Sequence, residues 1–174
     1  IQMNKDNPQV FDVYRINVNT GDMTVVGQNP GNITGWQTDH NGKLRIAITT
    51  DGVNQSILYR DSEDQEFKPL LTTTFKETFA LLFFTFDNKN LYVSSNIGRD
   101  KASIVEYDIA NKKEIKVLYE NPDYDVNGLS YSRKRKVIEF ANYTGWKQEY
   151  HFFDKDTKDI YNDLTSKLPG KQLA

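Results

Sequence analysis

A repeat with a spacing of 46 to 47 residues is the feature of this sequence that most constrains its fold. Three short apolar segments end in an aspartate at this spacing, namely SILYRD at Asp61, SIVEYD at Asp108 and EYHFFD at Asp154. The same spacing relates Leu44 to Leu91 and then to Val137. A fixed period of this length, filled with short strands, is typical of a β-propeller, in which each repeat forms one blade.

Each full repeat divides into four stretches of strand-like sequence separated by short polar turns. The expected strands lie at 33–38, 43–49, 55–60 and 66–71, at 80–86, 90–95, 103–109 and 113–119, and at 126–132, 135–141 and 148–153. The aspartates and asparagines of the turns bond their own backbone and tolerate left-handed conformations, which explains their placement. The pattern therefore predicts antiparallel four-stranded blades joined by tight hairpins.

About half a repeat precedes the first full one. Residues 10–16 and 22–27 match the third and fourth strands of a blade, and Ile1 to Asn4 match the remnant of its second strand. We therefore expect an all-β fold, a β-propeller fragment of about three and a half blades. The expected boundaries are a half blade at 1–28 and blades at 29–72, 73–120 and 121–168.

The end of the chain carries two conflicting signals. Ile160, Leu164 and Leu168 recur every four residues before Pro169-Gly170, which indicates a short helix. The repeat instead requires a fourth strand after Thr157. We expect a short strand there, followed by a helical turn.

Composition excludes several classes of protein. The net charge is −2, and the one strongly basic cluster, RKRK at 133–136, falls in an expected hairpin turn. Nucleic acid is therefore not an expected partner. No apolar stretch approaches the roughly 20 residues of a membrane helix, so we expect no membrane partner. Cysteine is absent, which excludes disulfides and thiolate chemistry.

The sequence offers little for catalysis or metal binding. GLSYS at 128–132 lacks the final glycine of a nucleophile elbow and falls in an expected strand. The two histidines, His40 and His151, lie in a turn and a strand. DKDTKD at 154–159 lacks the glycine of a calcium loop, and a hairpin turn is the expected structure there. We expect no catalytic residue, no metal and no cofactor in this chain.

The longer connections are the best candidates for binding. They occur at 49–55, 94–102 and 141–148 within repeats and at 29–32, 72–79 and 121–126 between them, and an up-and-down blade places both sets at one end. Loops carry function more often than strands do. Arg99, Asp100, Tyr143, Trp146 and Lys147 combine charge with aromatic surface on two of these connections, so we expect them to contact a substrate or a docked domain.

Several strings together resemble one protein family. They are MNKDNPQVFDVYRINVNTG, NPGNITGW, TTDGVNQSILYRD, LFFTFDNKNLYVSSNIGRDKASIVEYD, GLSYSRKRKV and YHFFDKD. Over essentially the whole chain, the sequence resembles the propeller of bacterial prolyl oligopeptidase family serine peptidases, which include dipeptidyl aminopeptidases and acylaminoacyl peptidases. The resemblance implies a propeller above a C-terminal α/β-hydrolase domain that carries the Ser-Asp-His triad. That domain is absent from this chain, and a double-glutamate motif for the substrate's N-terminus is not evident.

The resemblance implies a non-catalytic propeller portion of a peptidase, gating or positioning short peptides. The expected partners are then the protein's own C-terminal α/β-hydrolase domain and short peptides, in the bacterial cytoplasm or periplasm. The alternative is a stand-alone β-propeller scaffold that binds proteins or ligands, because repeat folds serve this purpose widely. In both cases, open blade edges predict self-association of the isolated chain.

Overall fold

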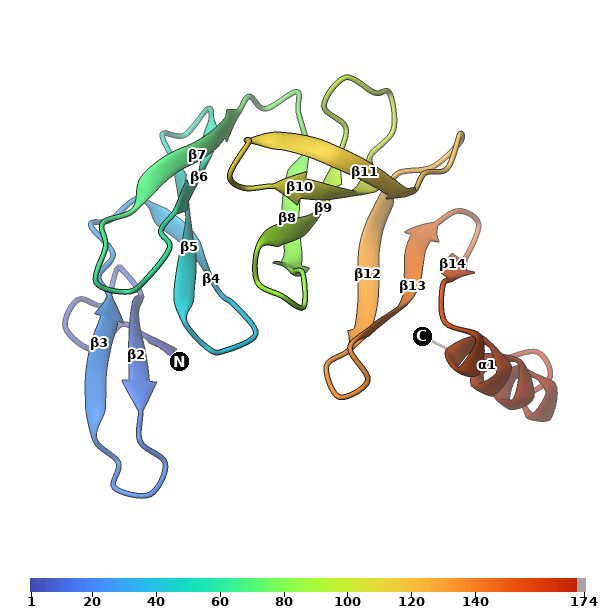
Figure 1. Ribbon diagram of the computed structural model, residues 1–174, viewed down its shortest axis with the longest axis horizontal. Coiled ribbons are helices and arrows are strands. Elements are labelled where there is room, and N and C mark those ends of the chain that lie inside the picture. Colours follow the sequence, from blue (N-terminus) through green and yellow to red (C-terminus); the bar gives the residue numbers. More distant parts are fainter. Residues whose placement is uncertain (172–174) are drawn as a thin grey trace. The chain divides into compact units, whose positions relative to one another are not determined.

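The computed structural model describes residues 1–171 and contains fourteen strands followed by one helix. The strands form four antiparallel sheets in chain order, of three, four, four and three strands (Figure 1). This confirms the all-β fold of a partial propeller. The chain divides into two compact units, Ile1–Lys76 and the part from Glu77 onward.

The first unit holds two sheets. The first sheet contains β1 (Gln2–Met3), β2 (Asp12–Ile16) and β3 (Met23–Gly27), and the second contains β4 (Ile33–Thr38), β5 (Leu44–Thr50), β6 (Gln55–Tyr59) and β7 (Lys68–Thr73). Neighbouring strands in each sheet are also neighbours in sequence. The expected identity of 10–16 and 22–27 as consecutive strands, with a remnant strand before them, is therefore confirmed.

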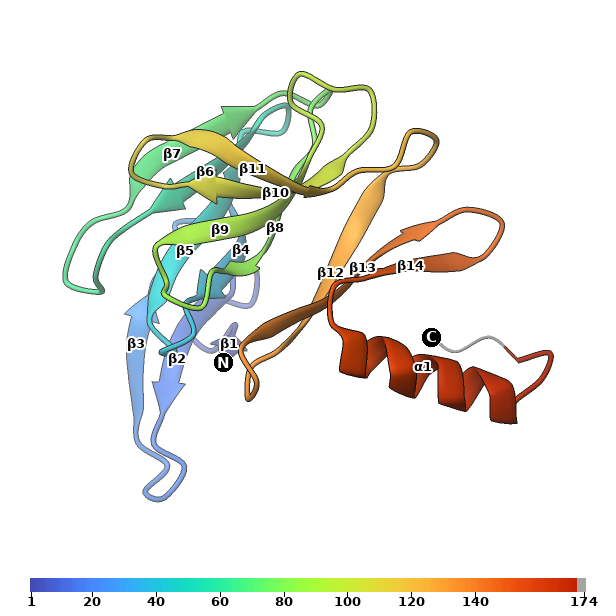
Figure 2. The same cartoon turned by 45° about the vertical axis from the view of Figure 1, so that its right-hand side comes forward.

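The second unit holds the other two sheets and the helix. The third sheet contains β8 (Phe79–Phe84), β9 (Asn90–Ser95), β10 (Ser103–Asp108) and β11 (Lys113–Tyr119). The fourth contains β12 (Val126–Ser132), β13 (Val137–Thr144) and β14 (Gln148–Phe152), and α1 (Lys155–Lys167) follows (Figure 2). No helix among the described residues is long and apolar enough to cross a bilayer.

In the two four-stranded sheets, the middle strands β5, β9 and β10 have buried residues on both faces. Leu44 and Leu91, equivalent repeat positions at the start of β5 and near the start of β9, are 1% and 0% exposed. Adjacent residues such as Ile104 and Val105 in β10 point to opposite faces, yet both are fully buried. Burial on both faces explains why these strands carry apolar residues at adjacent positions rather than only at alternate ones.

In the second unit, the third and fourth sheets pack face to face. Ile104, Val126 and Ala141 form a fully buried cluster at their interface. Backbone bonding reinforces it, because the Val126 amide donates to the Ala102 carbonyl at 2.8 Å. The Ser94 hydroxyl donates to the Val126 carbonyl at 2.7 Å. Successive sheets of this unit therefore stack as blades do.

In the first unit, close backbone approach and charge join the two sheets. Gly27 of β3 lies so near β5 that an added Cβ would sit 2.7 Å from a Leu44 methyl carbon. The Arg15 guanidinium of β2 contacts the Glu63 carboxylate at 2.7 Å. Glycine at position 27 is thus required by the packing distance between the sheets.

The expected strand after Thr157 is wrong, because α1 occupies Lys155–Lys167 instead. The hairpin expected at DKDTKD is wrong for the same reason. Asp154 is the N-cap of α1, and its carboxylate accepts the Thr157 amide at 3.0 Å. Its equivalents Asp61 and Asp108 precede hairpin turns, so the residues that follow the aspartate decide between turn and helix.

Candidate functional site

Three connections of the second unit meet at one end of its sheets, as the loop positions predict (Figures 1 and 2). The Ala102 amide, at the end of the β9–β10 loop, donates to the Asp125 carboxylate of the β11–β12 loop at 2.7 Å. On the other side of that loop, the ring of Tyr124 lies 3.2 Å from the place where Gly145 of the β13–β14 turn would carry a Cβ. The β11–β12 loop thus links the other two.

Arg99 is engaged within its own sheet. Its guanidinium donates to the Glu114 carboxylate of β11 at 2.5 Å and to the Ile97 carbonyl at 3.3 Å. The same carboxylate accepts the Ser95 hydroxyl at 2.6 Å. Arg99 therefore fixes the β9–β10 loop to β11, and this pairing leaves it less charge to offer a ligand.

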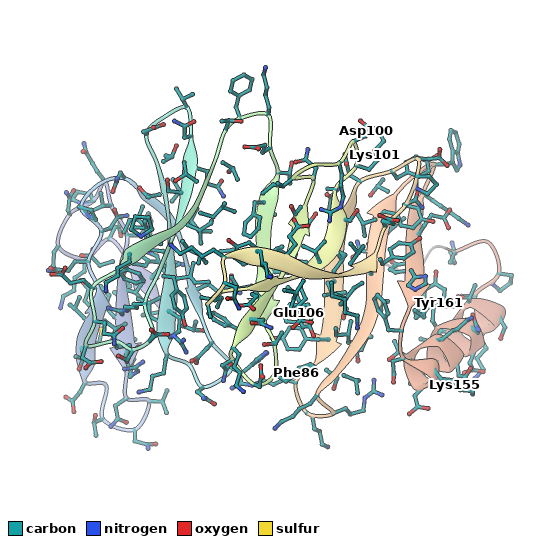
Figure 3. All side chains as sticks on the ribbon, turned by 45° about the horizontal axis from the view of Figure 1, so that its top comes forward. Phe86, Asp100, Lys101, Glu106, Lys155 and Tyr161 are labelled. Atoms are coloured by element: carbon teal, nitrogen blue, oxygen red, sulfur yellow. The ribbon has the colours of Figure 1, made fainter. Side chains whose placement is uncertain are left out.

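Two members of the expected site, Asp100 and Trp146, are highly exposed. The Asp100 carboxylate is 88% exposed and lies 3.3 Å from the Lys101 ammonium, and Figure 3 shows both at the same end of the unit. Trp146 is fully exposed at the tip of the β13–β14 hairpin, next to Lys147. A fully exposed tryptophan gains most when a partner covers it.

Tyr143 belongs to a row of stacked rings rather than to a loop. It lies at the end of β13 between Tyr124 and Tyr119, with ring centroids 5.8 Å and 6.2 Å away. Tyr119 stacks in turn on His151 at 4.1 Å. Burial, with Tyr119 nearby, raises the pKa of the Tyr143 phenol. The row supports the hairpin that carries Trp146.

The structure therefore brings Tyr143, Trp146 and Lys147 together on one hairpin. Among the residues that the structure describes, no hydrogen bond or ion pair joins Arg99 or Asp100 to that hairpin. The two groups share one end of the unit without forming a single cluster.

Ser130 and His151 take structural positions in the fourth sheet. Ser130 lies in β12, where its hydroxyl donates to the Glu139 carboxylate at 2.9 Å. His151 stacks on Tyr119, and burial lowers its pKa, with a smaller contribution from Lys158. Within residues 1–171, no group of three or more histidine, aspartate or glutamate side chains could hold a metal ion.

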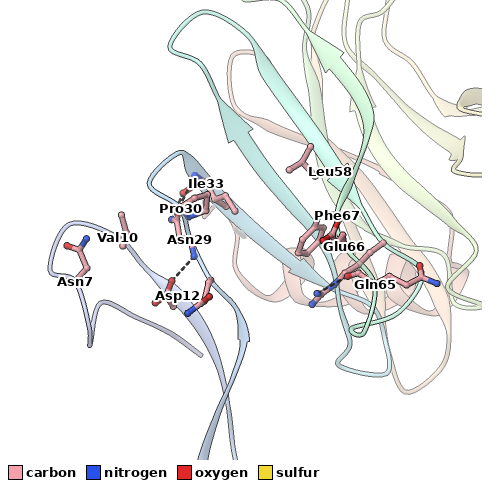
Figure 4. Close-up of a pocket in the computed structure, with 12 residues that line it drawn as sticks. Asn7, Val10, Asp12, Asn29, Pro30, Ile33, Leu58, Gln65, Glu66 and Phe67 are labelled. Carbon is pink, nitrogen blue, oxygen red and sulfur yellow. Dashed lines mark hydrogen bonds between the residues drawn. The ribbon is translucent and has the colours of Figure 1, made fainter.

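A hollow of about 860 Å³ lies in the first unit (Figure 4). One side is formed by the start of β2 and the β3–β4 loop, where the Asp12 carboxylate accepts the Asn29 amide at 2.6 Å. The other side is formed by Leu58, Arg60 and the residues leading into β7, including Phe67. A smaller hollow of about 410 Å³, beside β3, shares Arg60 and Phe67.

Arg60 is the residue of this hollow that the sequence interpretation missed. Its side chain donates to four backbone carbonyls, those of Leu44, Val26, Glu63 and Gln65. The repeat itself contains the signal, because Tyr107 and Phe153 occupy the equivalent positions in the next two repeats. A charged residue in a position otherwise aromatic marks a local departure from the repeat's packing.

Comparison with known proteins places these features in context. No family model matches the chain. Over 179 aligned residues, the sequence is 28% identical to the dipeptidyl aminopeptidase BIII of Pseudoxanthomonas mexicana, and the alignment covers 98% of this chain. The chain spans about 25% of that protein's length. Nearly the whole chain is thus similar to a stretch that makes up one quarter of that protein.

Proposed function

We propose that the chain is a non-catalytic propeller portion of a serine peptidase of the prolyl oligopeptidase family. The similarity of nearly the whole chain to a quarter of a dipeptidyl aminopeptidase carries this proposal. In it, the propeller gates or positions short peptides for a C-terminal α/β-hydrolase domain. Catalysis belongs to that domain, and this chain supplies a rigid scaffold of stacked sheets and the loops at their ends.

The loops of the second unit support a docking role in this function. Arg99 holds the β9–β10 loop in place, and the row of rings at Tyr143 holds the β13–β14 hairpin. Asp100, Trp146 and Lys147 remain available for contact. A fixed backbone that presents an exposed carboxylate and a fully exposed indole suits a docked domain or a peptide.

Labelling with a fluorophosphonate probe tests the non-catalytic role, because the probe modifies activated serines. We expect no labelling of the folded chain, with an active serine hydrolase as positive control. Stoichiometric modification of the chain would refute the proposal. A matched Ser130→Ala variant would then show whether the strand serine was the nucleophile.

The second candidate is a stand-alone interaction scaffold, and the fully exposed Trp146 favours it. The gene discriminates between the two candidates. A nucleophile-elbow sequence G-x-S-x-G in the same reading frame after Ala174, followed by aspartate and histidine, supports the peptidase. A stop codon directly after Ala174 in the natural gene supports the scaffold.

A further inference from the structure

The hollow of the first unit contains a largely buried positive charge that forms no direct ion pair. Arg60 is 8% exposed, and its guanidinium bonds only to carbonyl oxygens, at 2.9 to 3.4 Å. Among the described residues, no carboxylate lies within ion-pair distance of it. The Arg60 side chain has five N–H donors and bonds to four carbonyl oxygens, so one N–H of the guanidinium is left to bond a ligand. Burying a charge without an anion is costly, and an anion bound nearby would offset that cost.

The nearby carboxylates are committed elsewhere or can move away. Glu63 is held by Arg15 and by the Leu44 amide. Asp12 accepts the Asn29 amide, which draws it toward the β3–β4 loop. Glu66 also lines the hollow, but it is exposed and can extend into solvent. Glu63 and Asp64 act on the Arg60 guanidinium electrostatically and raise its pKa, but burial has the larger effect and lowers it. Neither of these two carboxylates lines the hollow, whereas Arg60 does.

The remaining walls suit a peptide. Apolar and amide side chains line the hollow. The apolar ones are Val10, Pro30, Ile33, Leu58 and Phe67. The amides are Asn7, Gln28, Asn29 and Gln65. The Phe67 ring lies 4.3 Å from the guanidinium carbon and holds it in place. The volume of the hollow, about 860 Å³, falls in the range of small-ligand sites, roughly 300–1,000 Å³.

We propose that this hollow binds a short peptide through its carboxylate, with Arg60 as the cation. The apolar side chain next to the carboxylate packs against Leu58 and Phe67, and the amide side chains bond the peptide backbone. The site lies wholly in the first unit and does not depend on the peptidase assignment.

An NMR titration of the isotope-labelled chain tests this site with three probes. They are N-acetyl-leucyl-phenylalanine, its C-terminal amide, and N-acetyl-leucyl-glutamate amide, which carries its carboxylate on a side chain. We expect the first to shift the Leu58, Arg60 and Phe67 resonances saturably, and the neutral amide to bind at least tenfold more weakly, because it lacks the charge. Binding of the third probe more tightly than the neutral amide would also support the proposal, because a peptide carboxylate would then again be the group that is recognised.

Two substitutions vary the charge of the walls without touching Arg60, which also joins the two sheets. Glu66→Gln removes a competing carboxylate and should tighten acid binding about two- to fivefold, whereas Gln28→Glu should weaken it by a similar factor. Glu120→Gln makes the same charge change on an exposed residue of the second unit and should leave affinity unchanged. Equal affinity for acid and amide, or no shift at Phe67 with millimolar acid, would overturn the proposal.

Discussion

Glu63 shows how a single side chain joins two sheets. Its carboxylate accepts two hydrogen bonds from Arg15 of β2, at 2.7 and 3.0 Å, and one from the Leu44 amide of β5 at 2.9 Å. These bonds, with that from Arg15 first, lower the pKa of Glu63 to about 2 from its usual 4.5. The ionised form is therefore the one that stabilises the first unit.

We predict that Glu63→Gln lowers the free energy of unfolding by about 1–2 kcal/mol at pH 7, since a charge-assisted bond becomes a neutral one. The folded pKa lies below the unfolded one, so this stabilisation is present above about pH 4.5 and is lost as the pH falls toward 2. Urea unfolding followed by Trp36 fluorescence should show the difference between the two proteins shrinking over that range.

Lys89→Ala provides the control, because its ion pair with Asp87 spans 4.0 Å and both side chains are mostly exposed. Its unfolding midpoint should equal that of the unaltered chain. Identical midpoints for Glu63→Gln and the unaltered chain at pH 7 would contradict the role given to Glu63.

At the scale of elements, α1 begins where it does because of Asp154. The carboxylate caps the Thr157 amide and hydroxyl and pairs with Arg135 at 2.8 Å. These partners lower its pKa to about 2. No residue of α1 is buried, so local interactions must supply much of its stability.

We predict that Asp154→Ala frays the first turn of α1. Amide exchange at 155–159 should become roughly three- to tenfold faster, the effect expected for a lost N-cap. Asp154→Asn keeps a capping oxygen and should restore most of the protection, whereas Asp156→Ala should change it little. Unchanged exchange in Asp154→Ala would show that another contact starts the helix.

The packing of β3 against the second sheet leads to a second prediction at this scale. Gly27→Ala places a methyl group 2.7 Å from Leu44 and 3.2 Å from the Trp36 ring. Leu44 is 1% exposed and cannot simply move away, so we expect a loss of about 1–3 kcal/mol in the free energy of unfolding. Val25→Ala, at a 43% exposed position of the same strand, should cost much less. Equal costs would mean that the sheets adjust freely.

The positions of the strands were largely predictable because the same strand pattern occurs in three successive repeats. The expected spans 33–38, 90–95 and 113–119 agree closely with β4, β9 and β11. The helix was not predictable from the repeat, because Asp154 can open a hairpin or cap a helix equally well. The four-residue spacing of Ile160 and Leu164 does indicate a helix, and in the structure this local signal prevails over the repeat.

The site was less predictable than the fold. Sequence position shows that Trp146 and Arg99 fall on connections, but not that Glu114 holds Arg99 or that Trp146 is bare. Those facts depend on the contacts between neighbouring strands. Arg60 could have been found from sequence alone by asking which repeat positions change in chemical type.

At the scale of the whole molecule, we predict that the isolated chain self-associates. The first sheet has only three strands, of which β1 has two residues, and the face of β3 exposes Met23 and Val25 at 41% and 43%. Exposed strand edges and apolar faces are sites of association. Light scattering at increasing concentration should show a rising apparent mass.

Val25→Lys tests whether β3 takes part, because a charge on an edge strand opposes further pairing. We expect a lower apparent mass for this variant, while Val18→Lys in the exposed β2–β3 turn should have less effect. A constant monomer mass for the unaltered chain would contradict self-association.

The aspartate that ends the third strand of each repeat has a consequence for how such chains diverge. A strand follows this aspartate in the first two full repeats, and a helix follows it in the third. The three strands before the aspartate keep their spacing in all three repeats. Changes of length or of secondary structure at this junction thus leave the buried layers intact. New surface elements can be gained there over evolution, and the same junction is a natural place to graft a foreign peptide.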